Sequence, residues 1–281
     1  MANNQASRRQ HLLTVATFRQ LIKYAMTFEN NTQSPLPADE SAIRQTLLNK
    51  RVSVLDKGWI ELQDLMGNDL AIVNAARASF LGESKGSDKD KKLLFYMMEH
   101  HHTSPFEQVE FRFRVRAPVV TWWQWVRHRT WSFNAQSGRY VAFDEEDFYV
   151  PSAWRKQSSI NKQASLGELS PEEGQPFSEA LDEHYKRSYQ LYQQALQAGI
   201  AREQARIFLP GFSVYYTWVC KVDAHNLMHF LQLRMAPEAQ YEIRVYAQAI
   251  YQQFFKPALP WTAEAFEKFM LIDSKESKDS K

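Results

Sequence analysis

Strict alternation of apolar and charged residues in one short segment is the feature that most constrains the fold. Between Gln108 and Arg116 every second residue is apolar, namely Val109, Phe111, Phe113 and Val115. The residues between them are charged, and successive side chains of a β-strand point to opposite faces of a sheet. This pattern is typical of a half-buried antiparallel strand, which has one face on a core and the other in water.

The remaining segments alternate between strand and helix patterns. A second strand is predicted over Val52–Leu55, and Pro118 suits the first turn of a helix that runs through Trp131. Further helices are predicted over Asp69–Phe80, Leu93–His101, 177–198, 201–208 and 222–256. Pro237 should kink or split the last of these helices. Two segments are predicted to be surface loops: the charged stretch Glu83–Lys92 and the Ser-, Gln- and Gly-rich stretch 152–176.

The two ends of the chain differ from the middle. Residues 1–50 are interpreted as an N-terminal extension of unknown function, with a helix over Leu12–Phe28. The first 28 residues are basic and contain no acidic residue, as in an organelle transit peptide, although a basic amphipathic helix or a frayed extension has the same composition. Residues 266–281 are predicted to be a disordered tail, because Ser274–Lys281 contains no apolar residue.

Composition excludes several classes of protein. The net charge is only +2, which disfavours a nucleic-acid partner. No apolar run approaches the roughly 20 residues of a membrane helix. Cys220 is the only cysteine, so intramolecular disulfides and Cys-rich zinc sites are excluded, and a cytoplasmic location fits. The chain also lacks the motifs GxGxxG and GxxxxGK, so any phosphate has to be bound by Arg and Ser side chains.

The segment Gln124–Tyr140 concentrates residues that bind anions. On a helix Gln124, Arg127, His128 and Trp131 would share one face. Downstream, the sequence Ser137-Gly138-Arg139 offers a hydroxyl, a backbone N–H and a guanidinium, a combination that suits phosphate. The alternative is purely structural, since cations also stabilise the C-terminal end of a helix.

The spacing within this segment resembles the signature of the flavin-dependent thymidylate synthases. The fixed positions of that signature are Arg-His-Arg-x-x-Ser-x-Asn-x-x-Ser-x-Arg-Tyr, and Arg127 to Tyr140 matches all of them. Other segments resemble the same family: Asp69–Phe80, His102–Glu107, Arg202–Pro210 and His225–Arg234. The resemblance covers residues 51–265, and it implies an α+β subunit with mixed helices packed on a mainly antiparallel sheet. It also implies a homotetramer whose active sites form where subunits meet.

The resemblance implies a reaction and its site residues. Methylenetetrahydrofolate would give a methylene to deoxyuridylate (dUMP), and FAD and NADPH would reduce it to the methyl of thymidylate (dTMP). The residues expected to bind dUMP are Gln124, Trp125, Val126, Arg127, Ala135, Gln136, Ser137, Gly138, Arg139, Arg206 and Arg234. Those expected to bind FAD are Ser104, Arg127, His128, Arg129, Ala135, Asp223, His225 and His229. His102 would lie where folate or NADPH enters, and no metal is expected.

The same resemblance assigns the activation of the substrate to Arg234. The flavin-free thymidylate synthases add a cysteine to C6 of the pyrimidine, but Cys220 lies in the apolar stretch Tyr215–Cys220, where a cysteine is usually inert. An arginine beside the uracil would instead stabilise negative charge at N3 and O4. Arg234 follows the apolar run 230–233, so we expect it at the edge of buried surface.

Four positions depart from what other members commonly carry. Ala135 stands where Glu or Gln is usual, Glu238 where His is usual, and Asp223 and His225 where Asn and Arg are usual. These changes affect the contacts expected of the individual residues, but the expected reaction stays the same.

Two other functions compete with this interpretation. His225 and His229 have the i, i+4 spacing of metal ligands, and His100–His102 with Glu99 and Glu107 offers more donors, which suggests a metal-dependent hydrolase or lyase. However, no Glu follows the first His as in HExxH. The Trp- and Arg-rich helix suggests a nucleic-acid binding module, against which the near-neutral charge counts.

Overall fold

A computed structural model describes residues 38–79, 82, 84–144, 147–159, 161 and 165–271. The chain divides into two units between Ala42 and Ile43, and every element from β1 onward lies in the second unit. The helix predicted over Leu12–Phe28, the basic segment 1–28 whose composition also fits a transit peptide, and the segment Ser274–Lys281 all lie outside the described residues. Helix α2 (Ala38–Leu47) spans the division.

A five-stranded antiparallel sheet forms the centre of the second unit. Its strand order is β1 (Arg51–Val54), β2 (Gly58–Met66), β3 (Glu110–Pro118), β7 (Tyr215–Asp223) and β4 (Ser132–Ala135). The predicted alternation is confirmed at β3, because Val109, Phe111, Phe113 and Val115 are all 0% exposed. The α+β class with a mainly antiparallel sheet is therefore confirmed.

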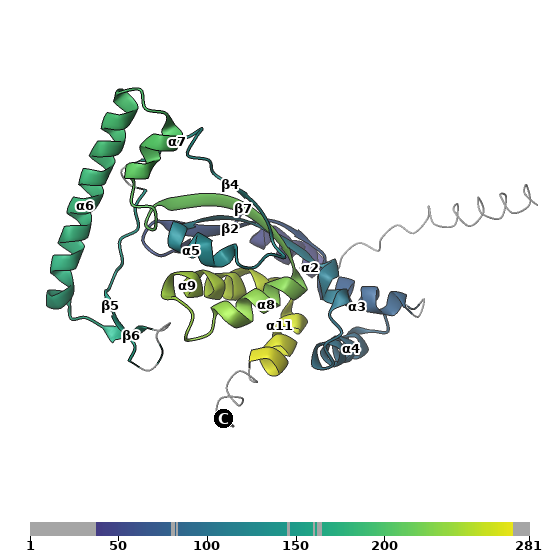
Figure 1. Cartoon of the computed structure of the whole chain (residues 1–281). Coiled ribbons are helices and arrows are strands. Elements are labelled where there is room, and N and C mark those ends of the chain that lie inside the picture. Colours follow the sequence, from purple (N-terminus) through teal and green to yellow (C-terminus); the bar gives the residue numbers. More distant parts are fainter. Residues whose placement is uncertain are drawn as a thin grey trace, which may run out of the picture. The chain divides into compact units, whose positions relative to one another are not determined.

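Helices cover one face of this sheet (Figure 1). They include α5 (Val119–Trp125), α8 (Ala224–Arg234) and α9 (Tyr241–Ile250), and α9 is followed by η3 (Tyr251–Phe255), α10 (Lys256–Ala258) and α11 (Pro260–Phe266). Helices α3 (Asp69–Ala78) and α4 (Ser87–Glu99) pack beside α11. The carboxylate of Asp69 ties α3 to α11 by accepting from the backbone N–H groups of Trp261 (2.7 Å) and Thr262 (3.0 Å).

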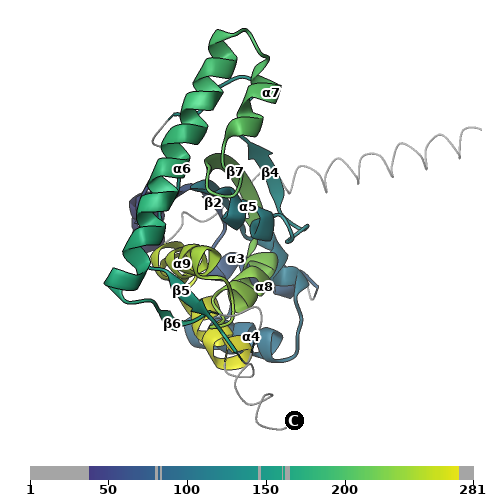
Figure 2. The ribbon, with the colours of Figure 1, turned by 60° about the vertical axis from the view of Figure 1, so that its left-hand side comes forward.

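A second, smaller core lies under the long helix α6 (Pro171–Gln197). This helix runs beside the short elements α7 (Arg202–Ala205) and η2 (Arg206–Phe208), as Figures 1 and 2 both show. Tyr185 joins α6 to the body of the unit, because its hydroxyl donates to the carbonyl of Tyr149 over 2.6 Å. A two-stranded hairpin, β5 (Arg155–Gln157) and β6 (Ser165–Glu168), precedes α6.

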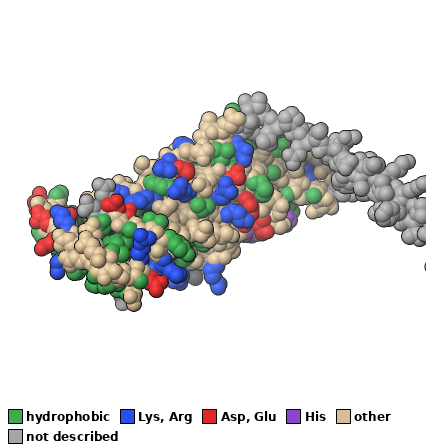
Figure 3. All heavy atoms as spheres, turned by 90° about the horizontal axis from the view of Figure 1, so that it is seen from above, with side chains coloured by type: hydrophobic (Ala, Val, Ile, Leu, Met, Phe, Trp, Pro, Cys, Tyr) green, Lys and Arg blue, Asp and Glu red, His purple; other side chains and the backbone are tan. Residues whose placement is uncertain are grey.

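The other face of the sheet carries charges of both signs, which are intermingled in the view from above (Figure 3). They include the ion pairs Arg51–Glu61 at 2.9 Å and Lys221–Glu110 at 2.7 Å. None of the helices in the described ranges is long and apolar enough to cross a membrane.

Several predicted elements differ from the structure. The helix from Pro118 ends at Trp125 rather than Trp131, because Ser132 already pairs with Lys221 of β7. The segment 152–176 is not a long loop, since it contains the β5–β6 hairpin and the start of α6, where Ser170 and Glu173 form a capping box. Helix α4 begins at Ser87, inside the predicted charged loop.

The C-terminal third also differs from the prediction. Residues 222 and 223 belong to strand β7, and Pro237 lies in the break between α8 and α9, so the predicted long helix is split as expected. The helical chain continues through η4 (Glu267–Leu271), whereas the sequence placed the start of the tail at residue 266. Phe266 itself is 0% exposed.

Candidate active site

Arg234 lies in the last turn of α8, which begins immediately after strand β7. Asp223 caps the helix, because its side chain accepts from the backbone N–H of Asn226 (2.8 Å) and from the Asn226 amide (2.7 Å). Farther along α8, Phe230 stacks on Trp125 with ring centroids 5.0 Å apart. This contact holds the end of α5 against α8, and it brings the segment after α5 next to Arg234.

The guanidinium of Arg234 donates from all three of its nitrogens to the end of α5. Its Nε donates to Nε2 of His128 over 2.9 Å. Its Nη1 donates to Oε1 of Gln124 and its Nη2 to the backbone carbonyl of Gln124, each over 3.3 Å. Gln124 lies in the last turn of α5 and His128 in the segment directly after it, so two neighbouring parts of the chain hold the same guanidinium. Its plane is therefore fixed by three contacts.

The charges around Arg234 are mutually consistent. Burial, together with the charges of Arg234 and His229, lowers the pKa of His128 to about 4, so its ring is neutral at neutral pH. A neutral ring has the lone pair that the Arg234 Nε–H requires. Burial and the nearby Arg127 lower the pKa of Arg234, but a guanidinium remains cationic at any physiological pH. The arrangement is thus a half-buried cation on a neutral acceptor.

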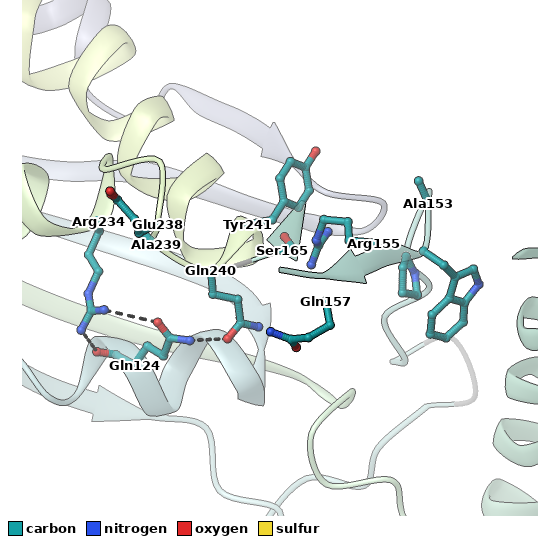
Figure 4. Close-up of a pocket in the computed structure, with 12 residues that line it drawn as sticks. Gln124, Ala153, Arg155, Gln157, Ser165, Arg234, Glu238, Ala239, Gln240 and Tyr241 are labelled. Carbon is teal, nitrogen blue, oxygen red and sulfur yellow. Dashed lines mark hydrogen bonds between the residues drawn. The ribbon is translucent and has the colours of Figure 1, made fainter. Parts of the chain in front are cut away.

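Arg234 and Gln124 form part of the wall of a cavity of about 580 Å³. Glu238, Ala239, Gln240 and Tyr241 line it from the segment that joins α8 to α9. The opposite side is formed by Pro151, Ala153 and Trp154 and by the hairpin residues Arg155, Gln157 and Ser165. Figure 4 shows Arg234, Gln124 and Gln240 side by side, with Arg155 and Gln157 facing them from the hairpin. The cavity therefore places two cations, Arg234 and Arg155, beside several amide groups.

A second group of predicted residues lies on the loop after β4 and on η2. Oγ of Ser137 accepts from the backbone N–H of Arg139 over 3.3 Å, and Nε of Arg139 lies 3.3 Å from Oε2 of Glu203. Arg202 donates to the carbonyl of Tyr140 over 2.7 Å, which fastens the loop to α7.

Gly138 is required in this loop by packing. A Cβ at this position would lie 2.6 Å from Cε2 of Phe143 and 3.4 Å from Cδ of Arg206. Because Gly138 has no side chain, the loop can pack closely against Phe143 and Arg206.

The two groups do not meet within one chain. The cavity wall contains Gln124 and Arg234 but none of Ser137, Gly138, Arg139 and Arg206. Elements α7 and α8 lie on different sides of β7 in both ribbon views (Figures 1 and 2). A single copy of the chain thus presents two separate parts of the predicted dUMP site.

The residues predicted to hold FAD lie mostly around the first group. The side chain of His128 is buried, and His229 is exposed with its ring 6.1 Å from that of His128. Ser104 belongs to η1 (Ser104–Gln108), which contacts α8. Ala135 ends β4 opposite Trp218, and its methyl packs on the core. His225 lies one turn before His229 on α8.

The charges in this region fit a phosphate-bearing group. Arg127 and Arg129 are both exposed, and in the described part of the chain neither forms an ion pair with a carboxylate. Arg127 also lies close enough to Arg234 to lower its pKa. An anion such as the diphosphate of a flavin nucleotide would neutralise this concentration of positive charge.

Some predicted residues have other roles in the structure. The side chain of Trp125 is 0% exposed and packs among Trp131, Trp218 and Phe230. It is a core residue, and its side chain is not available to a ligand. Asp223 is occupied as the cap of α8. His102 lies in an aromatic cluster, 5.9 Å from the ring of Tyr96.

The sequence did not indicate that Gln240, Glu242 and Arg155 belong to the site, where they continue the hydrogen bonds of Gln124. Gln240 and Glu242 are hydrogen-bonded to each other and Arg155 pairs with Glu242. These positions are far from Gln124 in sequence. A carboxylate inside the apolar segment 241–250 was the available signal, because an acidic residue facing a core is almost always paired.

The metal alternative lacks a donor set. No group of three His, Cys, Asp or Glu side chains suited to a metal ion occurs among the residues that the structure describes. His225 and His229 thus have the spacing of ligands without a third donor.

Comparison with known proteins gives one consistent result. Residues 61–261 match the family described as Thymidylate synthase complementing protein. A flavin-dependent thymidylate synthase from Thermus thermophilus is 48% identical over 220 residues, which is 78% of this chain and 79% of the relative. One from Thermotoga neapolitana is 43% identical over 220 residues, which is 78% of this chain and 95% of the relative.

Solved structures agree with the sequence relatives. The UMP/dUMP methylase PolB from Streptomyces cacaoi, bound with 5-Br dUMP, superposes with a TM-score of 0.70 at 33% identity, over 78% of this chain and 99% of that chain. Its complex with 5-Br UMP gives 0.69 at 34% identity, over 76% and 96%. On its sequence, its fold and the match over most of its length, the chain belongs to the flavin-dependent thymidylate synthase family.

Proposed function

We propose that this protein methylates dUMP at C5 to give dTMP, with methylenetetrahydrofolate as the carbon donor, NADPH as the reductant and FAD as the bound redox cofactor. The observation that carries the proposal is the Arg234 guanidinium, held by His128 and Gln124 on the wall of the cavity. The solved structures that resemble this chain are described as UMP/dUMP methylases, which supports a uridine nucleotide as substrate.

Arg234 is proposed to activate the pyrimidine by electrostatics. For C5 to attack a methylene group the ring has to be electron-rich, and a fixed cation beside N3 and O4 stabilises the form of the pyrimidine in which these atoms carry negative charge that is delocalised onto C5. A preorganised donor in a site that excludes water contributes several kcal/mol, typically about 3 to 4, to such a step. Because His128 and Gln124 already orient the guanidinium, little reorganisation is needed during the reaction.

A cysteine nucleophile is not part of this proposal. Cys220, the only cysteine, lies on β7 with its side chain 1% exposed, opposite Phe113 and Phe133 in the sheet. Burial raises the pKa of its thiol far above the ordinary value. A thiol that is buried and protonated cannot add to a pyrimidine.

The residues proposed to hold FAD are Ser104, Arg127, His128, Arg129, Ala135, Asp223, His225 and His229. When bound, FAD carries reducing equivalents between NADPH and the methylene unit. Arg127 and Arg129 supply the cations for its diphosphate. His128 faces Arg234 with its Nε2, so its contact with the cofactor would come from the rest of the ring. Asp223 caps α8, so its contact would be with a ribose or ring donor.

We further propose that the active site is completed between subunits of a homotetramer. The loop with Ser137, Gly138 and Arg139, together with Arg206, would bind the phosphate and sugar of dUMP, while Gln124 and Arg234 bind its base. Within one chain these two groups lie apart, as described above. A neighbouring copy that brings its loop to the cavity would unite them.

The experiment that tests this function is the visible absorbance spectrum of the purified protein with and without NADPH. A protein with the proposed function is yellow as purified or after FAD is added, and NADPH bleaches the flavin bands. Formation of dTMP from dUMP and methylenetetrahydrofolate then follows. A colourless protein that neither takes up FAD nor oxidises NADPH would contradict the proposal.

A further inference from the structure

A chain of hydrogen bonds extends from Arg234 along the wall of the cavity toward the β5–β6 hairpin. The Gln124 amide accepts from Arg234 through Oε1 and donates through Nε2 to Oε1 of Gln240. Nε2 of Gln240 in turn donates to Oε2 of Glu242 over 2.8 Å. Figure 4 shows the first three members in a row, Arg234, Gln124 and Gln240. Five residues take part when Arg155 is included, and we call them the Arg234 relay.

The far end of the relay is a buried ion pair. Oε1 of Glu242 accepts from Nη2 of Arg155 over 2.6 Å and from the hydroxyl of Tyr149 over 3.1 Å. Burial opposes the ionisation of Glu242, but the hydrogen bonds from Arg155 and Gln240 outweigh it, so the pKa of Glu242 lies below its ordinary value. Glu242 is therefore an anion, with an exposed fraction of 3%. Arg155 is steadied further by the ring of Tyr241, 4.7 Å from its guanidinium carbon.

The two charged ends determine the orientation of both amides between them. A guanidinium only donates and a carboxylate only accepts. Gln240 must therefore turn its NH₂ toward Glu242, which leaves its carbonyl for Gln124. Gln124 must then turn its NH₂ toward Gln240, and its carbonyl faces Arg234. A flip of either amide would oppose two donors or two acceptors, so the relay has one allowed direction.

We propose that Gln240 and Glu242 are positioning residues for Arg234, which act through the amide of Gln124 and are anchored by Arg155. This inference rests on the proposed function, since it names the residues that orient the activating cation. A free glutamine side chain presents its carbonyl and its NH₂ with similar ease. The buried carboxylate removes that freedom, and it keeps the Gln124 carbonyl on the guanidinium while the pyrimidine binds.

The first test is Gln240→Met, which keeps the length of the side chain and removes both hydrogen bonds. We expect kcat to fall about tenfold, the effect of losing an oriented hydrogen bond to a charged group. The KM for dUMP should change much less, because the substrate is still bound by the other residues of the site. The matched control is Gln248→Met, on the exposed side of α9, which should behave as wild type. Flavin content and thermal midpoint establish that both variants are folded.

The second test is Gln240→Glu, whose readout is a pH profile. When protonated, the introduced carboxyl group donates to Glu242 and accepts from Gln124, so the relay is intact. When ionised, it faces Glu242 as a second carboxylate, and the two repel. The other charged groups around this position, Arg155, Arg234 and Glu238, are the same in wild type. We expect kcat near the wild-type value at acidic pH and an additional loss of about tenfold as the pH rises.

The control for the second test is Gln248→Glu, which adds the same charge outside the relay and should follow the wild-type profile. If Gln240→Met retains wild-type kcat, or if the profile of Gln240→Glu runs parallel to wild type, the positioning role is wrong. If Gln240→Met does not fold, the pH profile of Gln240→Glu decides. A wild-type protein that makes no dTMP would instead contradict the proposed function, so the two failures are distinct.

Discussion

Nε of Arg234 donates a hydrogen bond to Nε2 of His128 over 2.9 Å. Because Nε2 accepts, the ring carries its proton on Nδ1 and is neutral. Protonation of His128 would remove this acceptor and place two cations side by side. Burial and the charges of Arg234 and His229 lower the pKa of His128 to about 4. The contact that orients the proposed activating residue therefore persists through the physiological pH range.

The lowered pKa of His128 predicts a pH-dependent stability. The unfolded chain binds a proton at His128 near its ordinary pKa, 6.5, while the folded chain binds it only near 4. Between about pH 4 and 6.5 the unfolded chain therefore carries a proton at His128 that the folded chain does not. The free energy of unfolding is fully retained above pH 6.5 and decreases as the pH falls from about 6.5 toward 4. Its slope is at most about 1.4 kcal/mol per pH unit.

The variant His128→Gln isolates this effect, because a glutamine accepts from Arg234 but does not titrate. Urea unfolding of both proteins should be measured at several pH values between about 4.5 and 7, at one protein concentration. The wild type should lose more unfolding free energy on acidification than the variant. Equal losses in the two proteins would show that His128 has an ordinary pKa.

Gly138→Ala is predicted to weaken the binding of dUMP. The added Cβ would lie 2.6 Å from the buried ring of Phe143, so the loop that carries Ser137 and Arg139 has to shift. Overpacking of this kind costs roughly 1 to 3 kcal/mol, and we expect the Kd for dUMP to rise about tenfold. Gly211→Ala is the control, since a Cβ at Gly211 meets nothing within 4 Å. Unchanged affinity in Gly138→Ala would mean that the loop does not bind the nucleotide.

Ser137→Ala tests whether this hydroxyl positions the substrate or reacts with it. Oγ of Ser137 accepts from the N–H of Arg139, and on the proposed function it also contacts the phosphate. Loss of one such hydrogen bond should raise the KM for dUMP about tenfold, with kcat at saturating dUMP largely retained. Steady-state kinetics over a wide range of dUMP concentration separates the two constants. Complete inactivity at saturation would point to a nucleophilic serine and against electrostatic activation.

The sequence predicted those helices and strands that have one face on the core and the other face in water. Strand β3 has one face on the core and one in water, so its charged and apolar residues alternate, and the sequence alone showed which of them face the core. Strand β7 was missed because Thr217 and Val219, on the face opposite Trp218 and Cys220, are themselves partly covered. Without a clear polar face, its aromatic run has no period of two.

The site was predicted only as far as local motifs extend. The Arg-His-Arg signature located His128 and the Ser137–Arg139 loop, because their spacing in sequence is fixed, and Gln124 lies one turn before it. It could not show that the loop and the cavity lie apart within one chain. Nor could it indicate Gln240 and Glu242, whose partners Gln124 and Arg155 are remote in sequence and meet only through the packing of α9 against α5 and the hairpin.

The central claim is that Arg234, and not a cysteine, activates the pyrimidine. It is tested most directly by measuring dTMP formed from dUMP, methylenetetrahydrofolate and NADPH by wild type, Cys220→Ala and Arg234→Ala. We expect wild type and Cys220→Ala to make dTMP, while Arg234→Ala retains flavin that NADPH bleaches and makes none. Inactive but folded Cys220→Ala, or dTMP formation by Arg234→Ala, would contradict this mechanism.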